Sequence, residues 1–451
     1  MAQAPRVRRL AARMLPRQLF SYQRNVYLLL LFTLGKGFQL SIAALSINLY
    51  VVKGLHYSLA FAGVVAAMPA IGALLASIPM GILADRLGRK PLLIVSGFLN
   101  PLALIAIGLS DSQPLLIIAS LANGFLASAY WVTNLPILTE STTDDQRVGV
   151  LALNNFLLLG VGALGALIGG FVPKLVAAQL QVDAYSAVPL RYGVLAAAAA
   201  VFVPAVPLIF LHEPRGRKRV KPDPLTVVEE PYVEAAKFQA TATGIEPVDP
   251  VGRRAIATLF LKLLIPDLLF TTGEGAVIAL LQVFFVARYF LRTDTLGVLF
   301  TLAGLIGGAT SLTAPRFVRR FGKLRMATSM QYLGAPVILL IGFAPIFPLA
   351  ACAEFLRQIL RGLFEPTYAA FTMERVSTRL RGTLSGFYSV TWSMGFSIGP
   401  VVAGFLQQNV SLSASFVIGA TCLVVSATLL RIFFGSGQPQ HHSAATAAAA
   451  R

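Results

Sequence analysis

Seven polar side chains form a stripe in an otherwise apolar segment at residues 348–373. They are Glu354, Arg357, Gln358, Arg361, Glu365, Tyr368 and Thr372. Their spacings of three and four residues place all of them on one side of an α-helix. A guanidinium in such a stripe can bind an anionic group or a neighbouring acid, and a carboxylate partly shielded from water can accept a proton. The stripe predicts either a polar path for a bound solute or ion pairs that satisfy one another along the helix.

Three more segments carry polar stripes at helical spacing. They comprise Lys36, Gln39, Ser46 and Tyr50 within 26–52, Asn123, Tyr130 and Asn134 within 113–138, and Asp267, Thr271, Glu274 and the less well aligned Gln282 within 256–287. Lys36 and Glu274 lie about ten and about eighteen residues into their segments, near the middle of each. We expect these two residues to face each other across a cavity, directly or through a solute. Glu274 is the expected proton acceptor, and Arg361 is expected to hold an anionic group of the solute or a neighbouring acid.

The segments that position these stripes are long enough to cross a membrane. Of the 451 residues, 56% are apolar and 12% are charged, and the mean hydropathy is +0.73. A soluble domain is about half apolar and about a quarter charged, so this chain has too little polar surface to coat a water-soluble globule. Runs of about 18 or more residues without charge can span the hydrocarbon core. Twelve spans are expected at 26–52, 57–84, 91–110, 113–138, 148–173, 192–211, 256–287, 295–315, 326–344, 348–373, 382–407 and 411–430.

The basic residues are distributed as in a multi-pass membrane protein. Lys and Arg number 37 and Asp and Glu number 19, which gives a net charge of +18. Alternate loops hold 28 of the 37 basic residues, whereas the intervening loops hold five. The positive-inside rule then places both termini and the long central loop in the cytoplasm, with the protein in the plasma membrane. A nucleic-acid partner is not expected, because the sequence has no compact basic domain to bind one.

The chain divides into five parts. We expect a basic cytoplasmic N-terminus at 1–25, six helices at 26–211, a proline-rich cytoplasmic linker at 212–255, six helices at 256–434 and a disordered tail at 435–451. The N-terminus has no short apolar core followed by a cleavage site, so the first helix itself is expected to direct insertion. Cys352 and Cys422 lie in apolar runs and are expected to pack inertly; no metal or cofactor is expected.

The two groups of six helices share sequence features in the same order. These are Arg86-Leu87-Gly88-Arg89 with Arg320-Phe321-Gly322-Lys323 and Arg147 with Arg381, both at an offset of 234 residues, and Gly35-Lys36-Gly37 with Gly273-Glu274-Gly275 and Tyr130 with Tyr368, both at an offset of 238. Each match alone is short. Together they predict two parallel six-helix repeats related by an axis along the membrane normal.

The loop after the second span carries a compact motif. It reads Gly81-Ile-Leu-Ala-Asp85-Arg86-Leu-Gly88-Arg89-Lys90. Gly81 permits close backbone approach, and Gly88 permits a tight turn between helices. This loop resembles the signature of the major facilitator superfamily, G-x-L-A-D-R-x-G-R-[KR], at every defined position.

The resemblance implies a conformational latch between the two halves. Its residues would be Gly81, Asp85, Arg86, Gly88, Arg89 and Glu140. Asp85 would face the start of the eleventh span near Gly382-Thr383, and Arg89 would pair with Glu140. The alternative is that these charges only anchor the loop at the lipid headgroups.

Two other patterns of the family are incomplete. Many proton-coupled members carry an arginine four residues before a glycine in the fourth span, where this chain has Ser120 before Gly124. Antiporters often show G-P-x-x-G-G in the fifth span, where this chain reads Gly165-Ala166-Leu-Ile-Gly169-Gly170. A related pattern, Gly399-Pro400-Val-Val-Ala403-Gly404, lies in the eleventh span. The resemblance therefore favours an antiporter subtype without fixing it.

The resemblance implies an all-α membrane protein of twelve transmembrane helices in two six-helix pseudo-symmetric bundles. In the family, the first, fourth, seventh and tenth helices line a central cavity, and the two bundles rock about it in alternating access. The expected function is secondary active transport of a small organic solute, as proton-linked efflux, by a monomer in the lipid bilayer. The first alternative is facilitated or proton-coupled uptake of an organic acid or other metabolite.

Other classes of function leave different marks in a sequence. An ATP-driven pump is not expected, because no phosphate-binding loop is visible. An enzyme is not expected, because the sequence shows no nucleophile–base or metal constellation. A non-transporting sensor or scaffold would keep the helices without needing polar residues in the middle of the membrane, and it remains the alternative of another class.

Overall fold

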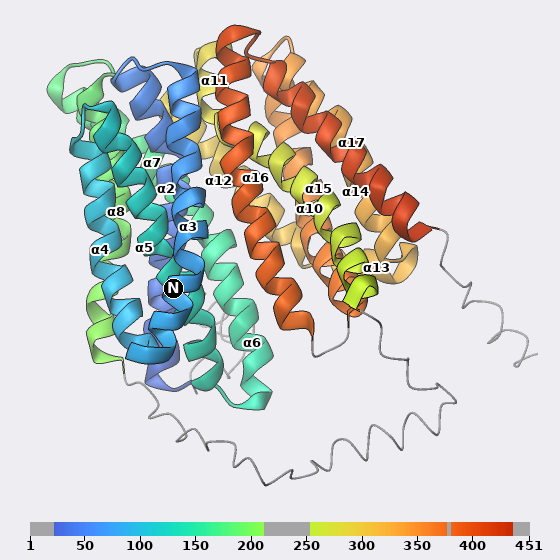
Figure 1. The fold of residues 1–451 in the computed structure, drawn as a ribbon. Helices are drawn as coiled ribbons and strands as arrows, with labels where there is room; N and C mark the ends of the chain where they lie inside the picture. Colours follow the sequence, from blue (N-terminus) through green and yellow to red (C-terminus); the bar gives the residue numbers. More distant parts are fainter. Residues whose placement is uncertain (1–21, 212–252, 377–379, 436–451) are drawn as a thin grey trace, which may run out of the picture.

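The computed structural model describes residues 22–211, 253–376 and 380–435. Every element within these ranges is a helix, and the helices stand together as a bundle (Figure 1). Phe210 and Arg253 lie at the same end of this bundle, which we call the linker end. The opposite end is called the far end. Nearly all of the expected N-terminal segment, linker and tail fall outside the described residues.

The N-terminal half contains six spanning segments. They are α2 (Arg24–Leu49) with the π-helical turn η2 (Tyr50–Gly54), α3 (Leu59–Leu87), α4 (Arg89–Leu109), α5 (Gln113–Glu140), a fifth segment of α6 (Asp144–Asn155), η3 (Phe156–Gly160), η4 (Val161–Leu164) and α7 (Gly165–Leu180), and α8 (Ala187–Ala205) with η5 (Val206–Phe210).

The C-terminal half repeats this arrangement. Its elements are α10 (Arg253–Ile278) with α11 (Leu281–Tyr289), α12 (Thr293–Ser311) with the short α13 (Ala314–Phe321), α14 (Lys323–Phe343), α15 (Phe347–Glu374), α16 (Arg381–Asn409) and α17 (Ala414–Phe434). Among the described residues, eleven segments are apolar and long enough to cross a membrane by composition alone. The twelfth segment is α15, whose 28 residues carry the predicted stripe of charges.

Several helices continue beyond the charge-free stretches that predicted them. The fifth span is expected to end at residue 173, but α7 continues through Lys174 to Leu180. The sixth is expected to begin at residue 192, but α8 begins at Ala187 and includes Arg191. Long basic side chains near a membrane surface keep their charged ends in water or beside a partner, so the helix does not need to stop before them.

One tight turn occurs in both halves. Gly88 separates α3 from α4 and has φ of 90°, and Gly322 separates α13 from α14 and has φ of 77°. Residues with a side chain rarely adopt such positive φ angles, so both turns require glycine. The two positions are 234 residues apart, which is the offset of the predicted repeat.

The halves meet through two pairs of glycines. A Cβ added at Gly63 in α3 would lie 3.1 Å from the Cα of Gly404 in α16, and one added at Gly170 in α7 would lie 2.8 Å from the Cα of Gly297 in α12. Gly297 follows Gly63, and Gly404 follows Gly170, by the repeat offset of 234 residues. Gly170 and Gly404 also end the small-residue patterns of the fifth and eleventh spans. These patterns therefore let backbones of opposite halves pack in direct contact.

Polar contacts join the halves at the far end. The Nζ of Lys174 lies 2.6 Å from the Oδ2 of Asp294, and the backbone N–H of Ala60 donates to the Oε1 of Gln408 at 2.9 Å. The Nδ2 of Asn48 donates to the carbonyl oxygen of Ala279 at 2.6 Å. Ala279 lies where the seventh span is interrupted between α10 and α11, so Asn48 binds a carbonyl next to this break. Each of these contacts links one half to the other.

The linker end is more open. A Cβ added at Gly81 in α3 or at Gly386 in α16 would meet no atom within 4 Å. The side chains of Leu87, near the end of α3, and Thr383, near the start of α16, are exposed. The side chains of Asp85, Arg147 and Arg381 lie outside the described part of the structure. The two halves are thus in close contact at the far end and less closely packed at the linker end.

Candidate functional site

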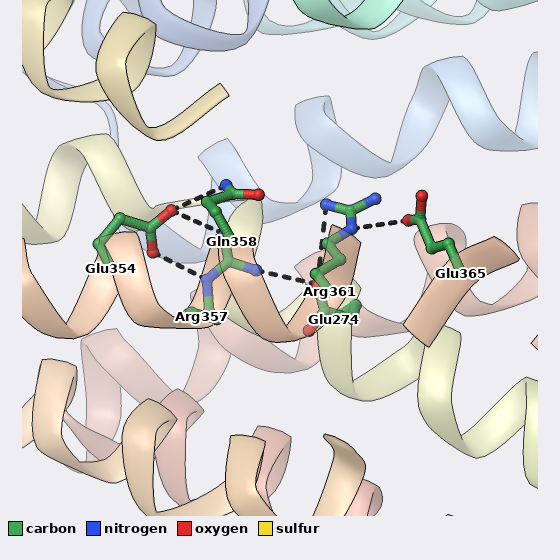
Figure 2. Close-up of polar contacts among 6 residues, drawn as sticks. All are labelled: Glu274, Glu354, Arg357, Gln358, Arg361 and Glu365. Atoms are coloured by element: carbon green, nitrogen blue, oxygen red, sulfur yellow. Dashed lines mark hydrogen bonds and ion pairs between the residues drawn. The ribbon is translucent and has the colours of Figure 1, made fainter. Parts of the chain in front are cut away.

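A cluster of charged groups lies between α10 and α15 in the C-terminal half (Figure 2). We call it the charge cluster, and it consists of Glu274, Glu354, Arg357, Gln358, Arg361 and Glu365. Arg357 is its centre, because its Nε and Nη2 each donate to the carboxylate of Glu354 at 2.8 Å while its Nη1 donates to the Oε2 of Glu274 at 3.0 Å. A single guanidinium therefore connects a carboxylate of its own helix to one on α10.

The remaining members extend the cluster along α15. Arg361 donates from Nε to the Oε1 of Glu365 at 2.7 Å, and its Nη1 lies 3.8 Å from the Oε2 of Glu274. Gln358 donates to the Oε1 of Glu354 at 2.9 Å. With all groups ionised, three carboxylates face two guanidiniums. The cluster is therefore close to electrically balanced, with one negative charge in excess.

Exposure of the cluster rises along α15 toward the linker end. The side chains of Glu354 and Arg357 are 0% and 3% exposed, whereas those of Arg361 and Glu365 are 30% and 45% exposed. A charge far from water is costly in a membrane unless it has a partner. The deepest charges have such partners, and the outer ones are open to a solute or to water from the linker end.

Aromatic and polar side chains hold the two helices in register around the cluster. Phe270 of α10 packs against Phe364 of α15 with ring centroids 4.3 Å apart. A narrow pocket there is lined by Glu274, Arg357, Arg361 and, from α14, Gln331. Gln331 donates to Ser426 of α17, and its own Oε1 has no hydrogen-bond partner in the structure. The pocket therefore offers one buried acceptor beside the charges.

Lys36 lies in a separate polar group within the N-terminal half. Its Nζ donates to the Oε1 of Gln39 at 2.6 Å and to the Oδ1 of Asn100 in α4 at 3.0 Å. Asn100 in turn donates to the Oδ1 of Asn123 in α5 at 2.7 Å. Lys36 is 1% exposed, and no carboxylate among the described residues pairs with it. Lys36 and Glu274 thus bind partners of their own halves and do not touch directly, so a solute bridging them stays a prediction.

Tyr130 and Asn134 belong to a second polar group of the same half. The hydroxyl of Tyr130 donates to the Oγ1 of Thr33 at 3.1 Å, and Asn134 donates to the Oδ1 of Asn154 at 3.2 Å. Thr33 also donates to Asn154, at 2.8 Å. All four are buried, which ties α2, α5 and α6 together. The ring of Tyr130 lies 5.7 Å from the Nζ of Lys36, so this group adjoins the lysine.

Asp267 and Tyr368 occupy the corresponding region of the C-terminal half. The hydroxyl of Thr391 in α16 donates to the Oδ2 of Asp267, and Tyr368 donates to the carbonyl oxygen of Leu263 at 3.0 Å. Asp267 is 7% exposed and has no cationic partner among the described residues. The rings of Tyr368 and Tyr388 are 6.0 Å apart. Asp267 therefore links α10 to α16, whereas the charge cluster links α10 to α15.

Sequence spacing did not identify several partners of these residues. Asn100, Asn154 and Thr391 each complete one of the polar groups, but each comes from a helix without a predicted stripe. An isolated amide in an apolar span is a signal by itself, because it needs a partner in the membrane. The sequence does not show which neighbouring helix supplies that partner.

The signature loop forms the same ion pair in both halves. Arg89 at the start of α4 pairs with Glu140 at the end of α5, and Lys323 at the start of α14 pairs with Glu374 at the end of α15. Both residues of each pair are related to those of the other by the offset of 234. The pairing of Arg89 with Glu140 is the one that the resemblance implied. Arg86 is exposed, and the role of this loop as a latch stays a prediction.

We expect Glu140→Gln and Glu374→Gln to have small and similar effects on stability. Both carboxylates are about half exposed, at 52% and 59%, and ion pairs of this kind contribute about 0–1 kcal/mol. The midpoint of thermal unfolding of the purified variants measures this, with Glu365→Gln as a control inside the charge cluster. A large loss for Glu140→Gln alone would show that this pair has a structural role which its counterpart lacks.

The comparisons with known proteins agree with this architecture. The profile of the Major Facilitator Superfamily matches residues 29–393 and, a second time, residues 268–450. The chain belongs to this superfamily. Its members include the uncharacterized MFS-type transporter YceJ of Bacillus subtilis (strain 168), which is 24% identical over 212 residues. That match covers 45% of this chain and 54% of YceJ, so the chain spans about half the length of this relative.

Two further similarities extend over most of this superfamily member. Multidrug resistance protein 1 of Bacillus subtilis (strain 168) is 20% identical over 391 residues, which is 85% of this chain and 90% of that protein. The crystal structure of the nucleoside transporter NupG matches with a TM-score of 0.67 and 16% identity, covering 92% of this chain and 100% of that one. At this identity the structural match shows the fold, which is that of a multi-pass transporter of twelve helices.

Proposed function

We propose that this superfamily member is a secondary active transporter that exports a small organic solute in exchange for protons. The observation that carries the proposal is the position of Arg357, which shares its charge between Glu354 and Glu274 inside the membrane. Buried ionisable groups are costly there, and they usually mark a path for a solute or an ion. A scaffold without transport would not need such a group next to a partly open stripe.

The proposed coupling step starts with Glu274. A proton taken up by its carboxylate would remove the negative charge that Arg357 and Arg361 share. Arg357 would then bind Glu354 alone, and Arg361 would keep Glu365. Because Glu274 is the member that comes from α10, its neutralisation loosens the link between α10 and α15. An anionic group of the solute at Arg361 would act on the same link, so proton and solute can bind in alternation.

The proposal includes an orientation in the plasma membrane. The linker end would face the cytoplasm, since the described residues there include the basic turn Arg86 to Lys90 and the arginines of α13. The structure is closer packed at the far end, so it would represent the state that is open to the cytoplasm. A single chain would suffice, because both halves of the cavity come from one polypeptide.

Two alternatives are kept because particular observations favour them. The similarity to Multidrug resistance protein 1 supports export, but the fold is equally that of the nucleoside transporter NupG. Facilitated or proton-coupled uptake of an organic acid or other metabolite is therefore the first alternative. The other is a sensor or scaffold, in which the charge cluster would only tie α10 to α15.

Transport by the purified protein in proteoliposomes tests the proposal. A solute is first chosen by its ability to raise the midpoint of unfolding in a panel of metabolites and drugs, since a ligand at 100 times its Kd stabilises by about 2.7 kcal/mol. Its flux is then measured with and without an imposed pH gradient. We expect gradient-driven flux for the native protein and for Glu374→Gln, and none for Glu274→Gln.

The other outcomes separate the alternatives. Flux that follows only the gradient of the solute, and is unchanged by pH and by Glu274→Gln, would contradict proton coupling and favour facilitated transport. Binding of the solute without flux in either direction would favour a sensor. Loss of gradient-driven flux in Asp267→Asn but not in Glu274→Gln would move the proton site to the carboxylate beside Thr391.

A further inference from the structure

A second cavity lies on the C-terminal half, away from the charge cluster. It has a volume of about 770 Å³ and is bounded by α13, α14, α15 and the end of α17. In Figure 1 these helix ends lie at the linker end, on the side of the C-terminal half that faces away from the N-terminal half. The cavity is therefore at the height of the membrane surface and toward the lipid.

The wall of the cavity is apolar. It includes Phe317 and Phe321 of α13, Met326 and Met330 of α14, and Leu363 of α15. Phe317 and Phe321 are 44% and 51% exposed. A chain of hydrocarbon could lie against these side chains and cover them.

Two arginines at the cavity give it a positive charge. Arg325 begins the second turn of α14, and Arg431 lies in the last turn of α17. The lining contains no carboxylate, and neither arginine has an acidic partner among the described residues. Arg431 is instead positioned by neutral groups: its Nε donates to the Oγ1 of Thr328 at 3.3 Å, and its guanidinium centre is 4.8 Å from the ring of Tyr332. Both charges remain uncompensated.

The arginine on α14 does not follow from the internal repeat. Pro91 is the residue 234 positions before Arg325, in the equivalent turn of α4. The two turns otherwise correspond, with Arg89 and Lys323 each paired to a glutamate. The repeat therefore accounts for the turn but not for the additional positive charge at the cavity.

We propose that this cavity binds an anionic phospholipid. The phosphate would bind between Arg325 and Arg431, since guanidinium groups match the geometry of phosphate oxygens, and one acyl chain would lie along Phe317, Met330 and Leu363. Basic pockets between helices at the membrane surface suit lipid headgroups of this kind. This site is independent of the transported solute, because it lies outside the region between the two halves.

Native mass spectrometry of the purified protein tests this site. Phosphatidylglycerol and phosphatidylethanolamine with the same acyl chains are added in turn, and bound lipid is counted. We expect the native protein to retain phosphatidylglycerol in preference to phosphatidylethanolamine. Arg325→Gln and Arg431→Gln should each weaken binding about fivefold and the double variant about 30-fold, as expected for an arginine near an anionic lipid.

Two further variants separate the cavity from general surface charge. Arg319→Gln removes an equal charge from α13 without changing the lining, and it should bind phosphatidylglycerol as the native protein does. Ser329→Trp keeps both arginines but fills the cavity, and it should lose the lipid. The proposal is overturned if Arg319→Gln weakens binding as much as Arg325→Gln does, if Ser329→Trp has no effect, or if the native protein binds the two lipids equally.

Discussion

Replacing Arg357 by leucine should destabilise the protein by about 3–5 kcal/mol and abolish transport. The side chain is 3% exposed and satisfies both Glu354 and Glu274. Its loss leaves the carboxylate of Glu354 buried with only the amide of Gln358 as a partner. The free energy of unfolding in detergent and the flux in proteoliposomes measure the two effects.

Two companion variants show whether unpaired charge is the cause. Arg361→Leu removes a guanidinium one turn further along α15, but its partner Glu365 is 45% exposed, so a loss of about 1 kcal/mol or less is expected. Glu354→Leu combined with Arg357→Leu removes the pair together and should recover much of the stability while transport stays absent. If the double variant is no more stable than Arg357→Leu, or if it transports, the account of the cluster is wrong.

Linking the two halves at the far end should stop transport. Lys174 and Asp294 form an ion pair between α7 and α12, so cysteines at these positions can be joined by a short bifunctional thiol reagent. The link fixes the far end in its closed state, and alternating access then cannot proceed. We expect flux to fall in proportion to the fraction of protein that is crosslinked and to recover after reduction. The experiment uses a background with alanine at Cys352 and Cys422.

A matched pair of cysteines provides the control. Asp111 and Arg191 also form an ion pair at the far end, at 2.9 Å, but both belong to the N-terminal half. Crosslinking cysteines at these positions should leave flux unchanged, because six helices that move together keep their mutual distances. Equal inhibition by both crosslinks would show that the far end need not open between the halves.

Much of the fold could be predicted because membrane crossing depends on local composition. Apolar length identified the spans, and alternation of basic loops indicated their topology. The repeat was predicted from motifs such as those around Gly88 and Gly322, which require the same positive φ. The ends of α7 and α8 were missed, because Lys174 and Arg191 lie within helices and find partners there.

The site could be predicted only as far as one helix face determines it. Helical spacing grouped Glu354, Arg357 and Arg361 correctly on α15. Which groups they bind depends on how α10 and α15 pack, and that is a tertiary feature. For the same reason spacing could not show that Lys36 binds Asn100 of α4, since a lysine side chain has several directions in which to reach a partner.

The distance between the halves at each end of the bundle tests the central claim most directly. Spin labels are placed at Leu87 and Thr383 for the linker end, and at Asp183 and Phe290 for the far end, all of which are exposed. Pulsed electron spin resonance in lipid nanodiscs then measures both distances as the buffer is acidified or a solute is added. The account predicts two populations, with the distance at the linker end shortening as the one at the far end lengthens. Distances that stay fixed under every condition, or that change together at both ends, would contradict alternating access by this protein.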